Sequence, residues 1–275
     1  MNIEAAIESA EKKYRQILEE YFNEIWNGTV LISHGIDHHR RVWHHAKELL
    51  AEIIGSGSKI IPELPEKLII ACYMHDIGMS ADRSIRHGRK GVEICKQFLL
   101  RNHLDEANFK EVLYAIENHD NKEYINYSPE DAILTILSVA DDLDAFGFIG
   151  IYRYTEIYLT RGVASHLLGY RIRENAEKRY MNFISIFGYN TELADKHRQR
   201  FLILDRFFDY YNRESNMKIF NIHDPAGYYG VIHIISEMVN NKIPLGKILS
   251  GPYRFSKDPV ISNFLTGLRK ELADS

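Results

Sequence analysis

Apolar residues recur at three- to four-residue spacing through most of the 275-residue chain. This spacing places them on one face of an α-helix, whereas a half-buried strand requires strict alternation, which is weak here. The stripes predict helices within residues 3–25, 42–53, 65–76, 91–100, 109–119, 128–147, 151–162, 176–187, 201–211 and 231–239. The residues after the last stripe are expected to form a tail. The sequence therefore predicts an all-α fold, as a single domain over residues 1–275.

Composition narrows the class of protein. A net charge of −4 gives no reason to expect a nucleic-acid-binding surface. No run of about 18 apolar residues is present, so we expect no membrane span. The N-terminal stretch "MNIEAAIESAEKKYRQ" lacks the apolar region of a signal peptide. Cys72 and Cys95 both lie in helical patterns and are predicted to be small buried residues, so these features favour a cytoplasmic protein.

A histidine and an aspartate stand side by side at the end of an apolar segment. In "LIIACYMHDIGMS", residues 68–80, the helix pattern is apolar until His75 and Asp76. Each lies seven residues after an apolar residue, so both point towards the packed side of the helix. Burying a charged group is unfavourable unless the group is paired or bound to a metal. The pair therefore needs partners from elsewhere in the chain.

Three other helices carry similar side chains on their apolar stripes. His38 lies four residues before an apolar position, His119 three residues after one, and Asp141 four residues after one. Asp144 follows Asp141 by one further turn. Hydrogen bonds alone satisfy such a set poorly, whereas a divalent cation supplies a partner for imidazole and carboxylate together. The pattern predicts a site for Zn, Fe, Mn or Ni between facing helices.

Three motifs resemble those of the HD superfamily, whose members are metal-dependent phosphohydrolases with an all-α fold. They are "HxxRV" at 38–42, "HD" at 75–76 followed by Ile-Gly, and "ADDLD" at 140–144. The resemblance covers about residues 30–155 and implies an HD-domain helical bundle there. It does not account for the chain beyond about residue 160, where the stripes of apolar and aromatic residues predict an additional C-terminal helical extension, about 160–275. It also implies four metal ligands: His38, His75, Asp76 and Asp141.

Further motifs are similar to those of HD subfamilies that carry a second metal. "RHGRKGVEI", from Arg86, looks like their "HGxxGA" segment, and "AIENHD" looks like their next histidine motif. The resemblance implies His87 and His119 as additional ligands, with Asp76 bridging two ions. Gly91 is expected to let two helices approach closely. The alternatives are a solvated helix-start residue for His87 and a helix C-terminal residue favoured by the dipole for His119.

The resemblance implies hydrolysis of a phosphorus–oxygen bond by metal-activated hydroxide. Asp76 and Asp144 are the candidate catalytic carboxylates, the second as a holder of a water or a sugar hydroxyl. The candidate phosphate-binding residues are basic and comprise Arg83, Arg86, Lys90 and Arg153. The alternative for the charged run at 83–90 is a solvated helix face.

The remaining polar residues near the motifs are expected not to bind the metal themselves. Arg41 is expected to pair with a carboxylate and so to orient the ligands. His34, His39 and His44 are expected to face outward or to cap helices, and His45 to lie near the inner stripe. None of the four histidines is predicted to be a ligand.

Two rival functions stay open. The same six-ligand set occurs in HD-fold di-iron oxygenases, and a sensor could bind metal and nucleotide without turnover. The basic cluster around His87 favours a phosphohydrolase acting on a small phosphorylated substrate such as a nucleotide. Beyond about residue 160 the aromatic stripes predict packing helices, with a substrate lid or a homodimer surface as the alternatives.

Overall fold

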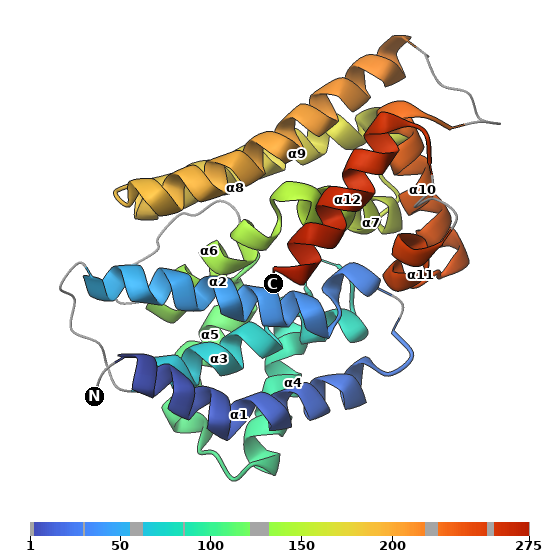
Figure 1. The fold of residues 1–275 in the computed structure, drawn as a ribbon. Coiled ribbons are helices and arrows are strands. Elements are labelled where there is room, and N and C mark those ends of the chain that lie inside the picture. The colour runs from blue at the N-terminus through green and yellow to red at the C-terminus, as the bar shows by residue number, and fades with distance from the viewer. Residues whose placement is uncertain are drawn as a thin grey trace. The chain divides into compact units, whose positions relative to one another are not determined.

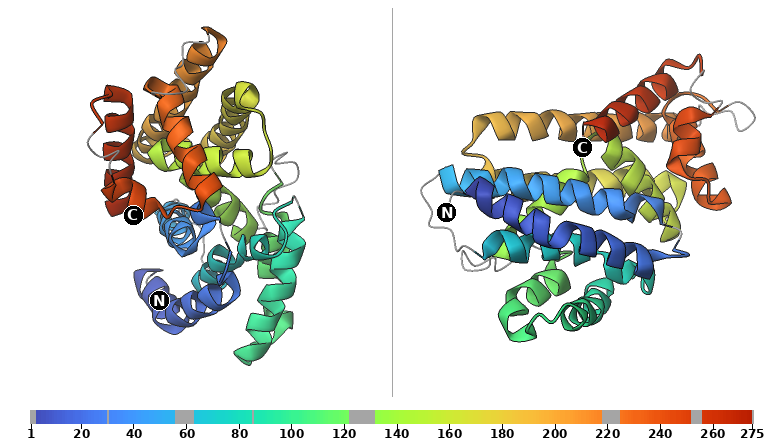
Figure 2. Two further views of the ribbon diagram at one scale, coloured as in Figure 1. Left: turned by 90° about the vertical axis from the view of Figure 1, so that its right-hand side faces the viewer. Right: turned by 60° about the horizontal axis from the view of Figure 1, so that its bottom comes forward.

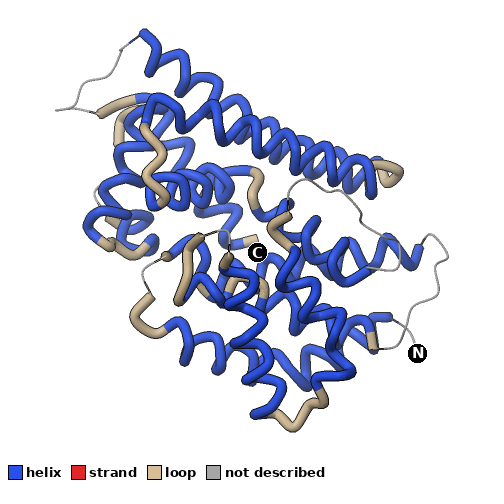
Figure 3. Tube along the Cα trace, turned by 180° about the vertical axis from the view of Figure 1, so that it is seen from behind, coloured by secondary structure: helices blue, strands red, loops and turns tan. Residues whose placement is uncertain are grey.

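The computed structural model describes residues 3–29, 31–55, 63–84, 86–121, 132–217, 225–251 and 256–274. Every regular element within these ranges is helical and none is a strand, as Figure 3 shows. The predicted all-α fold is therefore confirmed. No helix in this part of the chain combines the length and the apolar character that crossing a bilayer requires.

The chain divides into two compact units. The first consists of Met1–Thr29 and His34–Asp141, and the second of Val30–Ser33 and Asp142–Ser275. The expectation of one domain with a core over about 30–155 stays a prediction.

The first unit is built around α3 (Leu64–Met74). Leu68 and the six residues after it are all buried, because a helix that is apolar on every side must be enclosed. α3 contacts α1 (Ile3–Trp26), α2 (Ile36–Gly55), α4 (His87–Arg101) and α5 (Lys110–Asn118). Figure 1 shows α3 between α1 and α2. Cys72 of α3 and Cys95 of α4 are buried free thiols, as predicted.

Shorter elements complete this unit. They are the 3₁₀ helices η2 (Ile77–Ser80) and η3 (Glu106–Phe109), whereas η1 (Ile32–His34) is divided, with Ile32 and Ser33 in the second unit and His34 in the first. α4 packs against both η2 and α5. The helix α6 (Ala132–Asp144) begins in the first unit, and its last three residues belong to the second. Ser128 and Pro129, the predicted start of this helix, lie outside the described residues.

The carboxylate of Glu19 ties α1, α2 and α3 together. Arg40 donates two hydrogen bonds to it, at 3.0 and 2.6 Å, and the hydroxyl of Tyr73 donates a third at 3.1 Å. The bonds from Arg40 lower the pKa of Glu19 to about 2, despite the opposing effect of burial. This network fixes α2 against α3, the helices that carry His38 and the His75–Asp76 pair.

The second unit surrounds α7 (Gly147–Thr160), which is buried over most of its length. α7 contacts α8 (Ser165–Phe187), α9 (Thr191–Met217), α10 (Gly227–Asn241) and α12 (Pro259–Ala273). α8 and α9 are joined by a short turn and pack along each other, as Figures 1 and 2 show. The aromatic stripes of both helices are therefore packing surfaces in large part, with Phe183 and Phe208 fully buried.

The expectation of a C-terminal tail is wrong. α11 (Leu245–Ser250) and α12 lie in that region. The carboxylate of Asp258 accepts hydrogen bonds from the backbone N–H groups of Val260 and Ile261, at 2.9 and 3.0 Å, and Pro259 occupies the first helical position. An Asp-Pro pair is a helix start signal in its own right, and it does not depend on an apolar stripe.

Candidate metal centre

Two buried groups of histidine and aspartate share Asp76. The first group is His38, His75, Asp76 and Asp141, and the second is Asp76, His87 and His119. Within each group, one ligand atom per residue lies within 4.8 Å of all the others. Every member is buried. The structure thus brings together all six residues that the sequence predicts as ligands, and their role as ligands stays a prediction.

In the first group, one carboxylate oxygen of Asp76 faces two histidines. Its Oδ2 lies 3.4 Å from Nε2 of both His38 and His75. These two nitrogens are 3.1 Å apart. Oδ1 of Asp141 completes the group, at 3.6 Å from Nε2 of His38 and 3.9 Å from Nε2 of His75.

In the second group, the other oxygen of Asp76 faces a different pair of histidines. Its Oδ1 lies 3.2 Å from Nε2 of both His87 and His119, and those nitrogens are 3.3 Å apart. Each oxygen of one carboxylate therefore serves a separate group. A carboxylate placed in this way would be able to contact a cation in each group, and its predicted bridging role stays a prediction.

The backbone sets which nitrogen each imidazole presents to the centre. In His75, His87 and His119, Nδ1 lies 2.8–2.9 Å from the carbonyl oxygen three residues earlier. A carbonyl only accepts, so Nδ1 carries the hydrogen, and the Nε2 lone pair of the neutral ring points into the group.

Lone pairs that face each other at this range repel, and a cation placed between them would relieve that repulsion. Adjacent ligands on a metal with bonds of about 2.1 Å lie about 3.0–3.4 Å apart, which matches most of these distances. The donor set therefore fits a divalent cation in each group.

The charge at the centre also favours a cation. When a proton on Nε2 takes the place of a cation, burial raises the pKa of Asp76, but the neighbouring His75 and the hydrogen bonds that His119 and His38 then donate hold it well below its usual range. Burial lowers the pKa of His87, but its hydrogen bond to Asp76 outweighs this effect and raises the pKa to about 9. A proton and a metal ion compete for the same Nε2 lone pair, and the ionised carboxylate that attracts the proton also attracts a metal ion.

Glycines allow the close approach of backbones that the second group needs. A Cβ atom on Gly88 of α4 would lie 2.6 Å from the carbonyl oxygen of Glu117 in α5. A Cβ atom on Gly91 would lie 3.0 Å from Cγ2 of Ile116 and 3.4 Å from the carbonyl oxygen of His75. The predicted role of Gly91 is confirmed, and α4 reaches α5 closely enough for their histidines to meet.

Two histidines were placed wrongly by the sequence. His34 and His39 are buried, rather than facing outward or capping a helix. Nε2 of His34 lies 4.0 Å from Oδ2 of Asp76, so His34 stands at the edge of the centre. Its spacing of four residues from His38 was the available signal. Nδ1 of His39 instead bonds to the carbonyl of Cys72 at 3.0 Å, behind His75.

The predicted catalytic and phosphate-binding side chains outside the two groups differ in burial and in their partners. Asp144 and Arg153 both belong to the second unit, where Nη1 of Arg153 lies 3.0 Å from Oδ2 of Asp144 in a buried ion pair. Arg83 and Arg86 are exposed, and Lys90 is ion-paired to Glu93. Arg41 is buried, whereas His44 is exposed. The functional roles assigned to these residues stay predictions.

Comparison with known families identifies the fold. Residues 10–145 match the family model described as HD domain. This part of the chain is an HD domain. The HD domain includes α1 from residue 10 onward, which the motifs left outside the core, and it contains both groups around Asp76. No curated protein and no solved structure matches the chain.

HD domains bind divalent metals, and the two buried groups are compatible with such a site. Membership of the family suggests metal-dependent hydrolase-type activity.

Proposed function

We propose that the protein is a metal-dependent phosphohydrolase. It cleaves a phosphomonoester, phosphodiester or phosphoanhydride bond of a nucleotide or a small phosphorylated metabolite. The observation that supports this proposal is the placement of the Asp76 carboxylate, because each of its two oxygens faces a different pair of histidines. Divalent ions held there supply Lewis acidity and lower the pKa of water.

Different residues hold the two ions, orient the ligands and contact the substrate. His38, His75 and Asp141 hold one ion together with Asp76, and His87 and His119 hold the other. The backbone carbonyls behind the rings orient three of the histidines before any substrate arrives. His34, at 4.0 Å from Asp76, is placed to contact a substrate or its water at the edge of the centre.

Arg83 and Arg86 are exposed and closely precede His87 in the sequence. Guanidinium binds phosphate oxygens in a planar, two-pronged contact, so these residues are the proposed binders of the substrate phosphate.

Phosphate release without dioxygen tests the proposal. The purified protein is analysed for metal content, reconstituted with Mn or Fe, and incubated anaerobically with nucleotides, dinucleotides and phosphomonoesters. We expect phosphate or phosphorylated product, and we expect a chelator to stop its formation.

A di-iron oxygenase is a second candidate, because a carboxylate shared by two histidine groups suits two irons as well. It predicts oxygen consumption with iron and no anaerobic product. Binding of metal and nucleotide without turnover across the panel would instead indicate a sensor.

Replacing His87 with alanine is expected to separate the two groups. The bound metal should fall from two ions per chain to one, because His38, His75, Asp76 and Asp141 remain. Activity should fall at least about 10-fold. His44→Ala is the matched control, since His44 is exposed on α2 and should change neither value. Retention of both ions by the His87 variant would contradict the two-ion assignment.

A further inference from the structure

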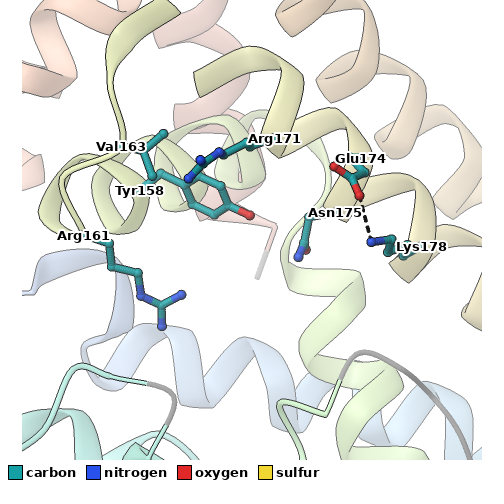
Figure 4. Close-up of a pocket in the computed structure, with 7 residues that line it drawn as sticks. All are labelled: Tyr158, Arg161, Val163, Arg171, Glu174, Asn175 and Lys178. Carbon is teal, nitrogen blue, oxygen red and sulfur yellow. Dashed lines mark hydrogen bonds and ion pairs between the residues drawn. The ribbon is translucent and has the colours of Figure 1, made fainter. Parts of the chain in front are cut away.

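The second unit contains a pocket of its own. A pocket with a volume of about 420 Å³ lies where the end of α7 meets one face of α8. This volume is within the range of ligand pockets in proteins. Figure 4 shows the side chains around it, and those used below are Tyr158, Arg161, Arg171, Glu174, Asn175 and Lys178.

The α7 side of the pocket is held by an ordered helix end. Gly162 follows the helix with a φ of 75°, which favours glycine. The backbone N–H of Gly162 donates to the carbonyl of Leu159, and that of Val163 to the carbonyl of Tyr158, both at 2.9 Å. These two bonds form a Schellman motif, so the backbone at Arg161 is fixed. The α8 side consists of residues 171, 174, 175 and 178, which share one helix face.

The lining of the pocket carries three positive charges and one negative charge. Nζ of Lys178 lies 2.9 Å from Oε1 of Glu174, so these two charges neutralise each other. In contrast, the side chains of Arg161 and Arg171 form no hydrogen bond or ion pair within the described part of the chain, although the charge of Arg171 also acts on Glu174. Two guanidinium groups match the charge of one phosphate monoester, which is close to −2 at neutral pH.

The remaining lining suits a planar ring with polar edges. Tyr158 is half-buried and provides an aromatic surface. Oδ1 of Asn175 accepts hydrogen bonds from the hydroxyl of Tyr154 at 2.8 Å and from Nε of Arg179 at 2.9 Å. These bonds fix the amide, and its nitrogen is left as a donor for a ligand.

We propose that this pocket binds a nucleoside monophosphate. Arg161 and Arg171 bind the phosphate, Tyr158 contacts the base, and the amide nitrogen of Asn175 donates to the nucleoside. Binding here does not depend on the metal centre, because every residue involved belongs to the second unit. The proposal therefore stands or falls separately from the phosphohydrolase activity.

The test is titration calorimetry of the full chain with a phosphonate analogue of AMP, in which CH₂ replaces the bridging oxygen and prevents hydrolysis. The pocket variant carries Arg161→Gln and Arg171→Gln. The control variant carries Arg101→Gln and Arg213→Gln, which remove the same charge from exposed positions outside the pocket. Asp76→Ala, measured in parallel, separates this site from the metal centre.

We expect one analogue bound per chain in the Asp76 variant, with affinity reduced at least about 10-fold by the pocket substitutions and unchanged by the control pair. All four substituted arginines are exposed or half-buried, and each pocket arginine is also tested alone, so loss of fold is separable from loss of binding. Equal binding by the pocket and control variants overturns the proposal. Displacement by orthophosphate as effective as by AMP overturns the nucleoside assignment.

Discussion

Replacing Asp76 with alanine is expected to remove both bound ions and to lower phosphate release at least about 1,000-fold. The reason is geometric. Oδ2 of Asp76 faces His38 and His75, and Oδ1 faces His87 and His119, so one substitution deletes a ligand from both groups. It also removes the negative charge that offsets a cation there. The metal content per chain and the rate of phosphate release measure the two effects.

Asp37→Ala is the matched control for this experiment. Asp37 precedes His38 on α2, but its side chain is 73% exposed and pairs with Arg40. The variant should keep the metal content and activity of the unmodified protein. If the Asp76 variant retained both ions, the bridging role of its carboxylate would be wrong, whatever the activity.

Gly78→Ala is expected to destabilise the protein by about 3 kcal/mol and to weaken the second metal group. A Cβ atom at this position would overlap the carbonyl oxygen of His87 and lie 2.5 Å from the backbone nitrogen of Gly91. Both obstacles are backbone atoms, which no rotamer change can move aside. α4 must therefore shift away from η2, and His87 moves with it.

Thermal unfolding and metal analysis measure the two consequences of Gly78→Ala. The melting temperature should fall by about 5–10 °C, and the bound metal should approach one ion per chain. Gly246→Ala is the control, because nothing lies within 4 Å of its added Cβ atom and α11 tolerates alanine. A Gly78 variant as stable as the Gly246 variant would show that α4 can withdraw from η2 at no cost.

Helix positions could be predicted where the signal is local. The apolar stripe of α1 and the continuous apolar run of α3 both appear as expected, because the period of a helix is written in neighbouring residues. α12 was missed although Asp258 and Pro259 mark its start. The sequence marks α12 by its N-cap residue and the proline that follows, and not by a long apolar stripe.

The polar residues on those stripes could also be predicted. His38, the His75–Asp76 pair and Asp141 each follow the spacing of an apolar face, so their burial is implied before any tertiary contact is known. His34 was missed because it precedes the helix and lies in the 3₁₀ turn η1, where helical spacing is a weaker guide.

By itself, the sequence determined the helical class, the main helices and the residue types that chelate a cation. Only the tertiary structure decided that one oxygen of Asp76 faces His38 and His75 while the other faces His87 and His119. It also decided that Asp144 pairs with Arg153. The physical reason is that periodicity is set by adjacent residues, whereas this division depends on how closely separate helices pack, down to the absence of a Cβ atom at Gly78.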